Sequence, residues 1–287
     1  MAKEDIAALL ALGAALFIAF SDVIHQQTAH DVTDEPVGHV ELFTRLLHDR
    51  RWWSGSLVAA VGFGLQAVAL GLGSVLLVQA LLVTSLLFAL PINARLTRRR
   101  VARSVWLWAV LLGGAEAIIV TVGHPTAGHS RASLHTWAGV VAVLGPVLLL
   151  CLLGARIWPG RVAAVLLAVV SGSSWGMFAV LTKGVVHLLG RGLGPLLASP
   201  ELYAWAVVAL AGTVFQQSSF RAGALTASLP TMTVVEPAVS AVLGVSLLGE
   251  VLRTGGAGSL TLVAAVMVMI VATVVLSRSE AVASPQR

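Results

Sequence analysis

Residues 52–94 contain no Asp, Glu, Lys, Arg or His, which excludes most of the ways in which a chain can fold in water. One crossing of a bilayer takes about 20 apolar residues, so this stretch is long enough for two helices that meet at Gly71 and Gly73. The composition agrees, because 57% of the residues are apolar and 11% are charged, against about 25% charged residues in soluble domains. The sequence therefore predicts an all-α polytopic membrane protein.

Apolar segments of membrane-spanning length recur along the whole chain and predict nine transmembrane helices. The first of them carries Asp22, which fits a retained helix better than a cleaved signal peptide. Segment 26–51 is too polar to cross and is expected to lie at the membrane interface. The nine predicted crossings are 5–25, 52–72, 74–95, 104–123, 135–154, 162–188, 201–220, 224–249 and 256–277.

The 18 Lys and Arg residues are distributed unequally between the two sides that these crossings define. Cytoplasmic loops are richer in Lys and Arg, so the side with thirteen is predicted to be cytoplasmic, with the N-terminus outside and the C-terminus inside. The formal charge of +5 then reflects basic loops, and no nucleic-acid partner is expected. Five basic residues fall on the outer side: Lys3, Arg131, Lys183, Arg191 and Arg253. Thirteen fall on the inner side: Arg45, Arg50, Arg51, Arg95, Arg98, Arg99, Arg100, Arg103, Arg156, Arg161, Arg221, Arg278 and Arg287.

The chain is predicted to contain an internal duplication. Shifting it by 150 positions aligns Gly62 with Gly212, Gln66 with Gln216, and Gly73 with Gly223. Helix 135–154 is left over between the two sets, so corresponding helices are five crossings apart and the repeats are inverted. The expected division is a first repeat at 1–123, a linker with the extra helix at 124–160, and a second repeat with a short cytoplasmic tail at 161–287.

The segment FQQSSFRAGALTASLPTMTVVEPAVSAVLGVSLLGE, residues 215–250, resembles a helix pair of the drug/metabolite transporter superfamily. EamA-like members show an alanine-rich corner, a proline, a Glu-Pro pair and a Leu-Gly-Glu exit. Residues 65–100 are similar to the other half of that pattern, with Ala80 where a proline is common. Ten-helix members have a second crossing in each half, whereas this chain has only 26–51 and 189–200 there. Nine crossings are similar to the magnesium-transporter-like branch, which stays an alternative.

Three carboxylates are predicted at membrane depth: Asp22, Glu116 and Glu236. A charge there costs about 2.5 to 3.5 kcal/mol or more and usually faces a cavity. Glu116 and Glu236 each lie about 18 Å along their helices, which places both near the midplane and facing the same space. Asp22 is expected nearer the cytoplasmic end, where a solvated carboxylate is the alternative. For Glu116 the alternative is an interhelical hydrogen bond from a protonated acid.

Glu236 is the leading candidate, because Pro237 follows it and frees the carbonyl of Thr233. Together with Pro230, this predicts a broken helix beside an acid, a pattern that holds ions or polar substrates in transporters. A packing kink satisfied by threonine hydroxyls is the alternative.

The sixth predicted helix carries a polar patch of small residues, 171–176. Gly172 and Gly176 have the spacing of closely packed helices, while Trp175 and Ser174 are expected to face the cavity. Glutamines from neighbouring helices are expected to line the same space or to hydrogen-bond between helices: Gln66, Gln79, Gln216 and Gln217.

Two patterns do not predict enzyme chemistry. Residues 172–176 read G-x-S-x-G, but a nucleophile elbow needs a strand-to-helix turn, and this segment lies within an apolar helix. His124, His129 and His135 share one loop and are expected to be solvated, while Lys183 is expected to reach the interface along its apolar stem. The single cysteine, Cys151, excludes a disulfide within the chain.

The predicted function is a transporter of the plasma (inner) membrane that moves a small polar or cationic solute by alternating access, coupled to protons. Glycines at the helix corners are expected to let the halves rock. One alternative is a magnesium or other divalent-cation transporter, with Glu236 and Glu116 as metal ligands. Another is a non-transporting membrane subunit that binds a lipid carrier or a partner protein. Expected partners are the bilayer, the solute or cation, and a second copy in a homodimer; no cofactor is expected.

Overall fold

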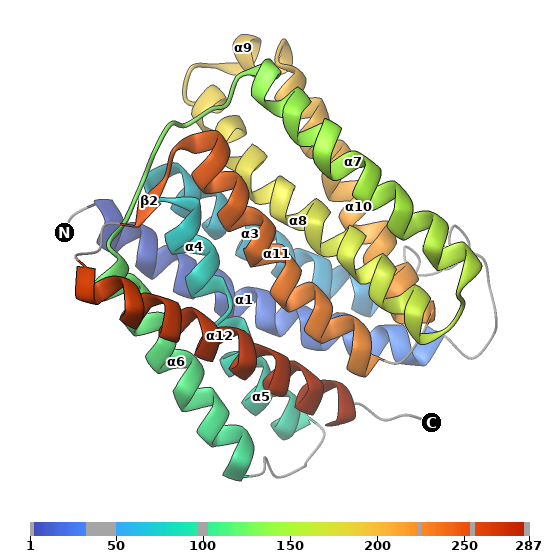
Figure 1. Cartoon of the computed structure of the whole chain (residues 1–287). Coiled ribbons are helices and arrows are strands. Elements are labelled where there is room, and N and C mark those ends of the chain that lie inside the picture. The colour runs from blue at the N-terminus through green and yellow to red at the C-terminus, as the bar shows by residue number, and fades with distance from the viewer. Residues whose placement is uncertain (1–2, 33–49, 97–102, 223–224, 253–255, 284–287) are drawn as a thin grey trace.

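The computed structural model describes residues 3–32, 50–96, 103–222, 225–252 and 256–283, and these are almost entirely helical (Figure 1). The only strands within these residues are β1 (Pro125–Thr126) and β2 (Val251–Leu252), which pair antiparallel. The helices are α1 (Lys3–Val32), α3 (Arg50–Leu72), α4 (Val75–Leu82), α5 (Ser85–Leu96), α6 (Arg103–Gly123), α7 (Leu134–Ile157), α8 (Arg161–Leu189), α9 (Leu193–Leu197), α10 (Pro200–Ala222), α11 (Leu225–Leu248) and α12 (Gly256–Ala283).

Seven helices in the described part of the chain are long and apolar enough to cross a membrane: α1, α3, α6, α7, α8, α11 and α12. The prediction of an all-α, multi-pass membrane protein is therefore confirmed. The expected crossing 201–220 forms α10, which has the length but is less apolar because it carries Gln216 and Gln217. The expected crossing 74–95 is divided into α4 and α5. Segment 26–51 begins as the last turns of α1, and most of it lies outside the described residues.

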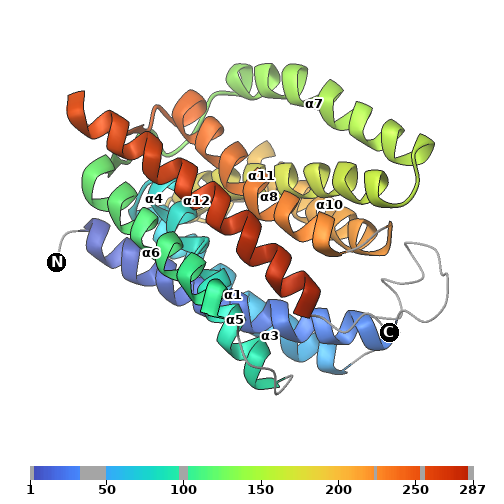
Figure 2. The same ribbon diagram turned by 60° about the horizontal axis from the view of Figure 1, so that its bottom comes forward.

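The helices pack in three principal groups. Helix α1 packs along α3 and also contacts α4 and α5, while α8 packs along both α10 and α11. Helices α6 and α12 pack against each other. Helix α7 packs on α8 at the edge of the bundle, and both views show it far from α5 and α6 (Figures 1 and 2). The central core forms where α1, α3, α4, α8 and α11 meet, with Ala11 and Ala15 of α1 fully buried against Leu70 and Val78.

Small residues set the closest helix contacts. A Cβ added at Gly62 of α3 would lie 3.0 Å from the side chain of Ile18 in α1. A Cβ at Gly176 of α8 would lie 2.9 Å from the backbone oxygen of Glu236 in α11, and Gly172 approaches the same helix. Such contacts leave no room for a side chain, so the predicted close packing of these two glycines is confirmed.

The predicted helix break at Pro230 and Pro237 is wrong, because α11 runs through both prolines. Membrane helices tolerate proline where hydroxyl groups and neighbouring helices satisfy the freed backbone. Here the Thr233 hydroxyl donates to the carbonyl of Leu229 at 2.9 Å, and the Ser240 hydroxyl donates to that of Glu236 at 2.8 Å.

A break lies instead between α4 and α5, within the expected crossing 74–95. Val83 and Thr84 donate to the carbonyls of Ala80 and Leu81, three residues earlier. These are the tight turns of a 3₁₀-helix, which often mark a bend in a longer helix.

Contacts between helix termini show which ends of the bundle lie together. Gly71, at the end of α3, approaches Val186 of α8, and Gly123, at the end of α6, approaches Leu252 of β2. The side chain of Arg131 reaches Glu201 at the start of α10. All these residues lie at the end of the bundle where β1 pairs with β2, which we call the β-ribbon end.

Candidate functional site

Two of the predicted carboxylates, Asp22 and Glu236, form the first candidate site. They come from α1 and α11, yet they are close enough to interact electrostatically. Asp22 is exposed and Glu236 is half-buried. The backbone of Glu236 is held against α8, where Gly172 and Gly176 allow the two helices to touch. The site therefore joins an acid on a tightly packed helix to an acid on a helix from the other half of the chain.

Asp22 lies deeper along its helix than predicted. The expected crossing ended at residue 25, but α1 continues to Val32. Ile18, one turn before Asp22, packs against Gly62 near the middle of α3. Since one turn of helix rises about 5.4 Å, Asp22 lies close to the middle of the bundle.

Glu116 occupies a different place from the other two acids. It lies in α6 with 2% of its surface exposed, and its Oε1 atom has no hydrogen-bond partner. Its neighbour Ala115 packs with Ala80 of α4 and Ala265 of α12. Glu236 lies instead on α11, against Gly172 and Gly176 of α8, and the prediction that Glu116 and Glu236 face one space stays a prediction. Within the described residues, no three His, Cys, Asp or Glu side chains gather as a metal site would require.

The predicted polar residues around the acids have separate roles. The hydroxyl of Ser174 donates to the carbonyl of Val170 in its own helix at 2.8 Å, as that of Thr233 does to Leu229. These two hydroxyls are therefore occupied within their helices. Gln66 is buried with its Oε1 atom unpartnered, whereas Gln216 is half-buried. The Nε2 atom of the buried Gln79 in α4 is unpartnered as well. A buried unpaired amide group is costly in a protein interior, so Gln66 and Gln79 both have capacity to bind a polar group.

Trp175 belongs to an aromatic cluster between α3, α8 and α10. Its ring stacks on Phe63 with centroids 5.5 Å apart and meets Phe178 edge-on at 5.2 Å. Phe178 in turn stacks on Trp205, whose Nε1 donates to the Thr182 hydroxyl at 2.9 Å. The Trp175 ring is thus held in place by neighbouring rings, and its role as a cavity wall stays a prediction.

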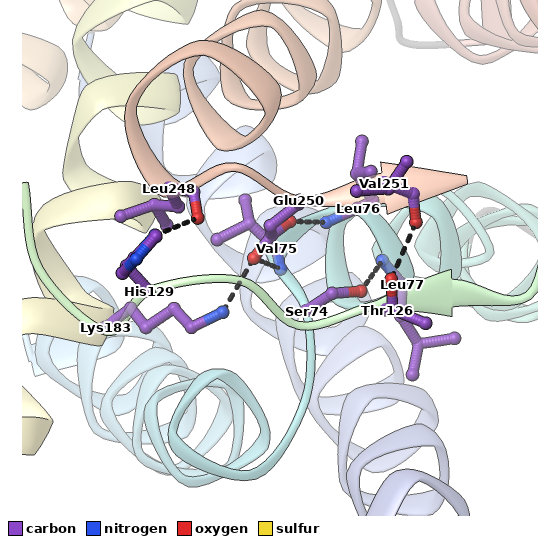
Figure 3. Close-up of polar contacts among 10 residues, drawn as sticks. All are labelled: Ser74, Val75, Leu76, Leu77, Thr126, His129, Lys183, Leu248, Glu250 and Val251. Carbon is purple, nitrogen blue, oxygen red and sulfur yellow. Dashed lines mark hydrogen bonds and ion pairs between the residues drawn. The ribbon is translucent and has the colours of Figure 1, made fainter. Parts of the chain in front are cut away.

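A second candidate site, at the β-ribbon end, surrounds Glu250 (Figure 3). One carboxylate oxygen of Glu250 accepts from the backbone N–H of Val75 at 2.8 Å, and the other accepts from Leu76 at 3.0 Å. The Lys183 ammonium donates to Glu250 at 2.6 Å. Ser74 caps the same helix by accepting from the N–H of Leu77 at 3.0 Å. We call this arrangement of Ser74, Val75, Leu76, Lys183 and Glu250 the Glu250 clasp.

The prediction that Lys183 reaches the membrane interface is wrong. Lys183 is 5% exposed and Glu250 is 2% exposed, so both charged groups are buried in the protein interior. Buried charges are retained when they are paired and hydrogen-bonded, and the two N–H groups of α4 complete the coordination of Glu250. The two residues are separated by 67 positions, and no local pattern in the sequence marks such a pair.

The loop that follows β1 covers the Glu250 clasp. The backbone N–H of His129 donates to the carbonyl of Leu248 at 2.7 Å, and the Thr126 hydroxyl donates to that of Val251 at 3.1 Å (Figure 3). Arg131 then pairs with the nearly buried Glu201 at 3.0 Å. The His129 ring nitrogen Nδ1 also lies 3.2 Å from the Leu248 carbonyl oxygen, although the residue is exposed.

Seven long apolar helices, with acids from distant helices brought together among them, define a multi-pass helical membrane protein. The chain belongs to the family of the Uncharacterized protein Cgl0250/cg0304 of Corynebacterium glutamicum. The two are 36% identical over 284 residues, which cover 97% of each chain. No protein-family model matches the sequence, and no solved structure matches the chain.

Proposed function

We propose that this protein is a transporter of the drug/metabolite type that moves a small polar or cationic solute across the membrane by alternating access. The observation that carries the proposal is the placement of two acids at membrane depth, Asp22 one turn beyond the contact of Ile18 with Gly62 and Glu236 at the contact with Gly176. Ionisable groups at membrane depth are costly and mark the pathways of ions and substrates. A pair contributed by helices α1 and α11 is also placed where relative movement of the two halves would change it.

The arrangement of the helices supports an inverted repeat in the proposed transporter. We assign α1, α3, α4 with α5, and α6 to one half, and α8, α10, α11 and α12 to the other. In each half the first helix packs along the second and also contacts the third. Gly62 and Gly212, which the internal duplication aligns, both lie on the second helix and approach the first, at Ile18 and Trp175 respectively. Helix α7 packs on α8 at the edge of the bundle, and we assign it to neither half.

The chemistry of the proposed site follows from the repulsion between two neighbouring carboxylates. A cation placed between Asp22 and Glu236, or a proton on one of them, relieves this repulsion. A cationic solute and a proton therefore compete for the same pair, which is the simplest basis for coupling their movements in opposite directions. Trp175 on α8 and the buried Gln66 on α3 supply an aromatic face and an amide elsewhere in the same bundle.

The experiment that tests this proposal measures proton movement in proteoliposomes that contain the purified protein and the trapped pH dye pyranine. Amino acids, tetraethylammonium and nucleotides are added one class at a time against an imposed pH gradient. We expect one class to drive protons out, and we expect Glu236→Gln and Asp22→Asn to abolish that signal. The Gln and Asn amides keep the size of the acids, so both variants should unfold at nearly the wild-type temperature.

Glu4→Gln is the matched control, because Glu4 is an exposed acid at the start of α1 and lies outside the site. It should keep the full signal. A wild-type protein that moves neither solute nor protons would contradict the proposal and favour a non-transporting membrane subunit. Normal flux in Glu236→Gln would remove this residue from the mechanism.

A magnesium pathway is the second candidate, because Asp22 and Glu236 together provide two hard oxygen donors. Mg²⁺ usually keeps several waters and binds through one or two carboxylates, so a pair is sufficient. Loading the same vesicles with a magnesium-sensitive dye separates the candidates. A divalent pathway predicts Mg²⁺ entry without proton exit, and the exchanger predicts the reverse.

A further inference from the structure

The Glu250 clasp joins elements that belong to different halves of the proposed transporter. Lys183 lies on α8 and Glu250 follows α11, so both charges belong to the second half. The N–H groups that the carboxylate binds belong to α4, in the first half. The clasp is also more deeply buried than the other contacts at the β-ribbon end, where Thr126 is only half-buried and the side chain of His129 is exposed.

The two kinds of bond made by Glu250 would respond differently if the halves separated. Movement of α4 away from α11 breaks the hydrogen bonds from Val75 and Leu76, but it leaves the pair with Lys183 intact. Opening therefore creates no isolated charge, which is the costly event when a buried ion pair is disrupted. The start of α4 also keeps its own cap, because Ser74 accepts from Leu77. The contact is thus strong when closed and can be released without leaving a buried charge unpaired.

The closed contact gains strength from the position of the carboxylate. The N-terminus of a helix carries partial positive charge and free N–H groups, and a carboxylate there is favoured. Lys183 holds Glu250 from the opposite side at 2.6 Å. The carboxylate is consequently oriented toward α4 before the halves meet.

We propose that Glu250 is a latch that holds the β-ribbon end closed by binding the N-terminus of α4 and releases α4 whenever that end opens. This inference rests on the alternating access of the proposed function. Lys183 is a positioning residue, since it acts by holding the carboxylate. The structure represents the state with the latch closed, in which Asp22 and Glu236 lie deeper in the bundle than the clasp.

The test measures how fast a membrane-impermeant maleimide labels a cysteine placed behind the clasp. Val78→Cys provides the reporter, because Val78 is fully buried and lies one turn of α4 beyond Val75. Cys151→Ser removes the native thiol. Labelling rates in proteoliposomes are compared for Glu250→Met, Lys183→Met and the double variant, and thermal unfolding is recorded for each. Thr126→Val is the matched control, since it removes a hydrogen bond at the same end without touching the clasp.

A latch predicts that labelling depends on the Glu250 carboxylate. Glu250→Met and the double variant should label at least tenfold faster than wild type, and Thr126→Val should label at nearly the wild-type rate. Lys183→Met should label at a rate between these two, because the carboxylate remains but loses the group that positions it. Stability should follow a different order, because each single variant leaves one buried charge unpaired and the double variant leaves none. The unfolding temperature should therefore fall in both single variants and recover in the double variant.

An ion pair with a purely structural role predicts that labelling tracks stability, with both single variants fast and the double variant slow. That result, or wild-type labelling in the double variant, would overturn the latch. If a single variant does not fold, the labelling rate of the double variant compared with that of wild type still distinguishes a latch from a structural ion pair. The labelling needs no solute, so a wild-type protein without flux would refute the transport proposal while the labelling separately tests the latch.

Discussion

Glu116 offers a prediction at the scale of a single residue, because one of its carboxyl oxygens is buried without a hydrogen-bond partner. The buried atom is Oε1, and the residue lies on α6. An unsatisfied buried polar group costs about 1 to 3 kcal/mol, and Met has a similar length without that cost. We expect Glu116→Met to raise the free energy of unfolding by about that amount, seen as a higher midpoint in detergent unfolding. A lower midpoint would show that the acid has a stabilising partner.

Glu116→Met also bears on the proposed transport, through the flux assay described above. A buried acid at membrane depth that lowers the stability of the fold is a candidate for a functional role. We therefore expect the stabilised Glu116→Met protein to lose flux, in contrast to a conservative change at an exposed acid such as Glu4. If the Glu116→Met variant is more stable and fully active, Glu116 contributes neither to the stability of the fold nor to transport.

At the scale of elements, the contact between α8 and α11 is set by Gly176. A Cβ at this position would lie 2.9 Å from the Glu236 carbonyl oxygen, a backbone atom that cannot turn away. Gly176→Ala must push the two helices apart, and overpacking of this kind costs about 1 to 3 kcal/mol. Gly139→Ala is the control, because nothing lies within 4 Å of that position in α7, and Ala favours helices over Gly by about 1 kcal/mol. Thermal unfolding should move in opposite directions for the two variants.

The positions of the helices were predictable because long apolar segments between charged loops have few alternatives. The break in the third helix was not, because it lies at Val83 and Thr84, where neither proline nor glycine marks it. The prolines of α11 gave a misleading signal, since hydroxyl groups and close packing keep that helix continuous. For the candidate site, the sequence indicated each acid separately but not which acids lie close together. Which acids meet depends on how α1 and α11 are arranged in space, as does the burial of Lys183 beside Glu250.

On the scale of the whole molecule, the distribution of basic residues predicts the orientation in the membrane. Five of the 18 basic residues were assigned to the outer side. Two of them, Lys183 and Arg131, are paired with acids at the β-ribbon end, at 2.6 Å and 3.0 Å. The other thirteen basic residues were assigned to the opposite side. Since positive charge is retained on the cytoplasmic side, the β-ribbon end should face outward.

Cysteine labelling of intact cells tests this orientation, starting from the Cys151→Ser protein. Ala127 is exposed in the loop after β1, and Pro159 is exposed in the turn between α7 and α8 at the opposite end. A membrane-impermeant maleimide added outside should modify Ala127→Cys and spare Pro159→Cys until the membrane is permeabilised. Both side chains are exposed, so a difference in labelling reports the side of the membrane and not burial. Labelling of Pro159→Cys alone in sealed cells would reverse the orientation and would make Glu250 a latch on the cytoplasmic side.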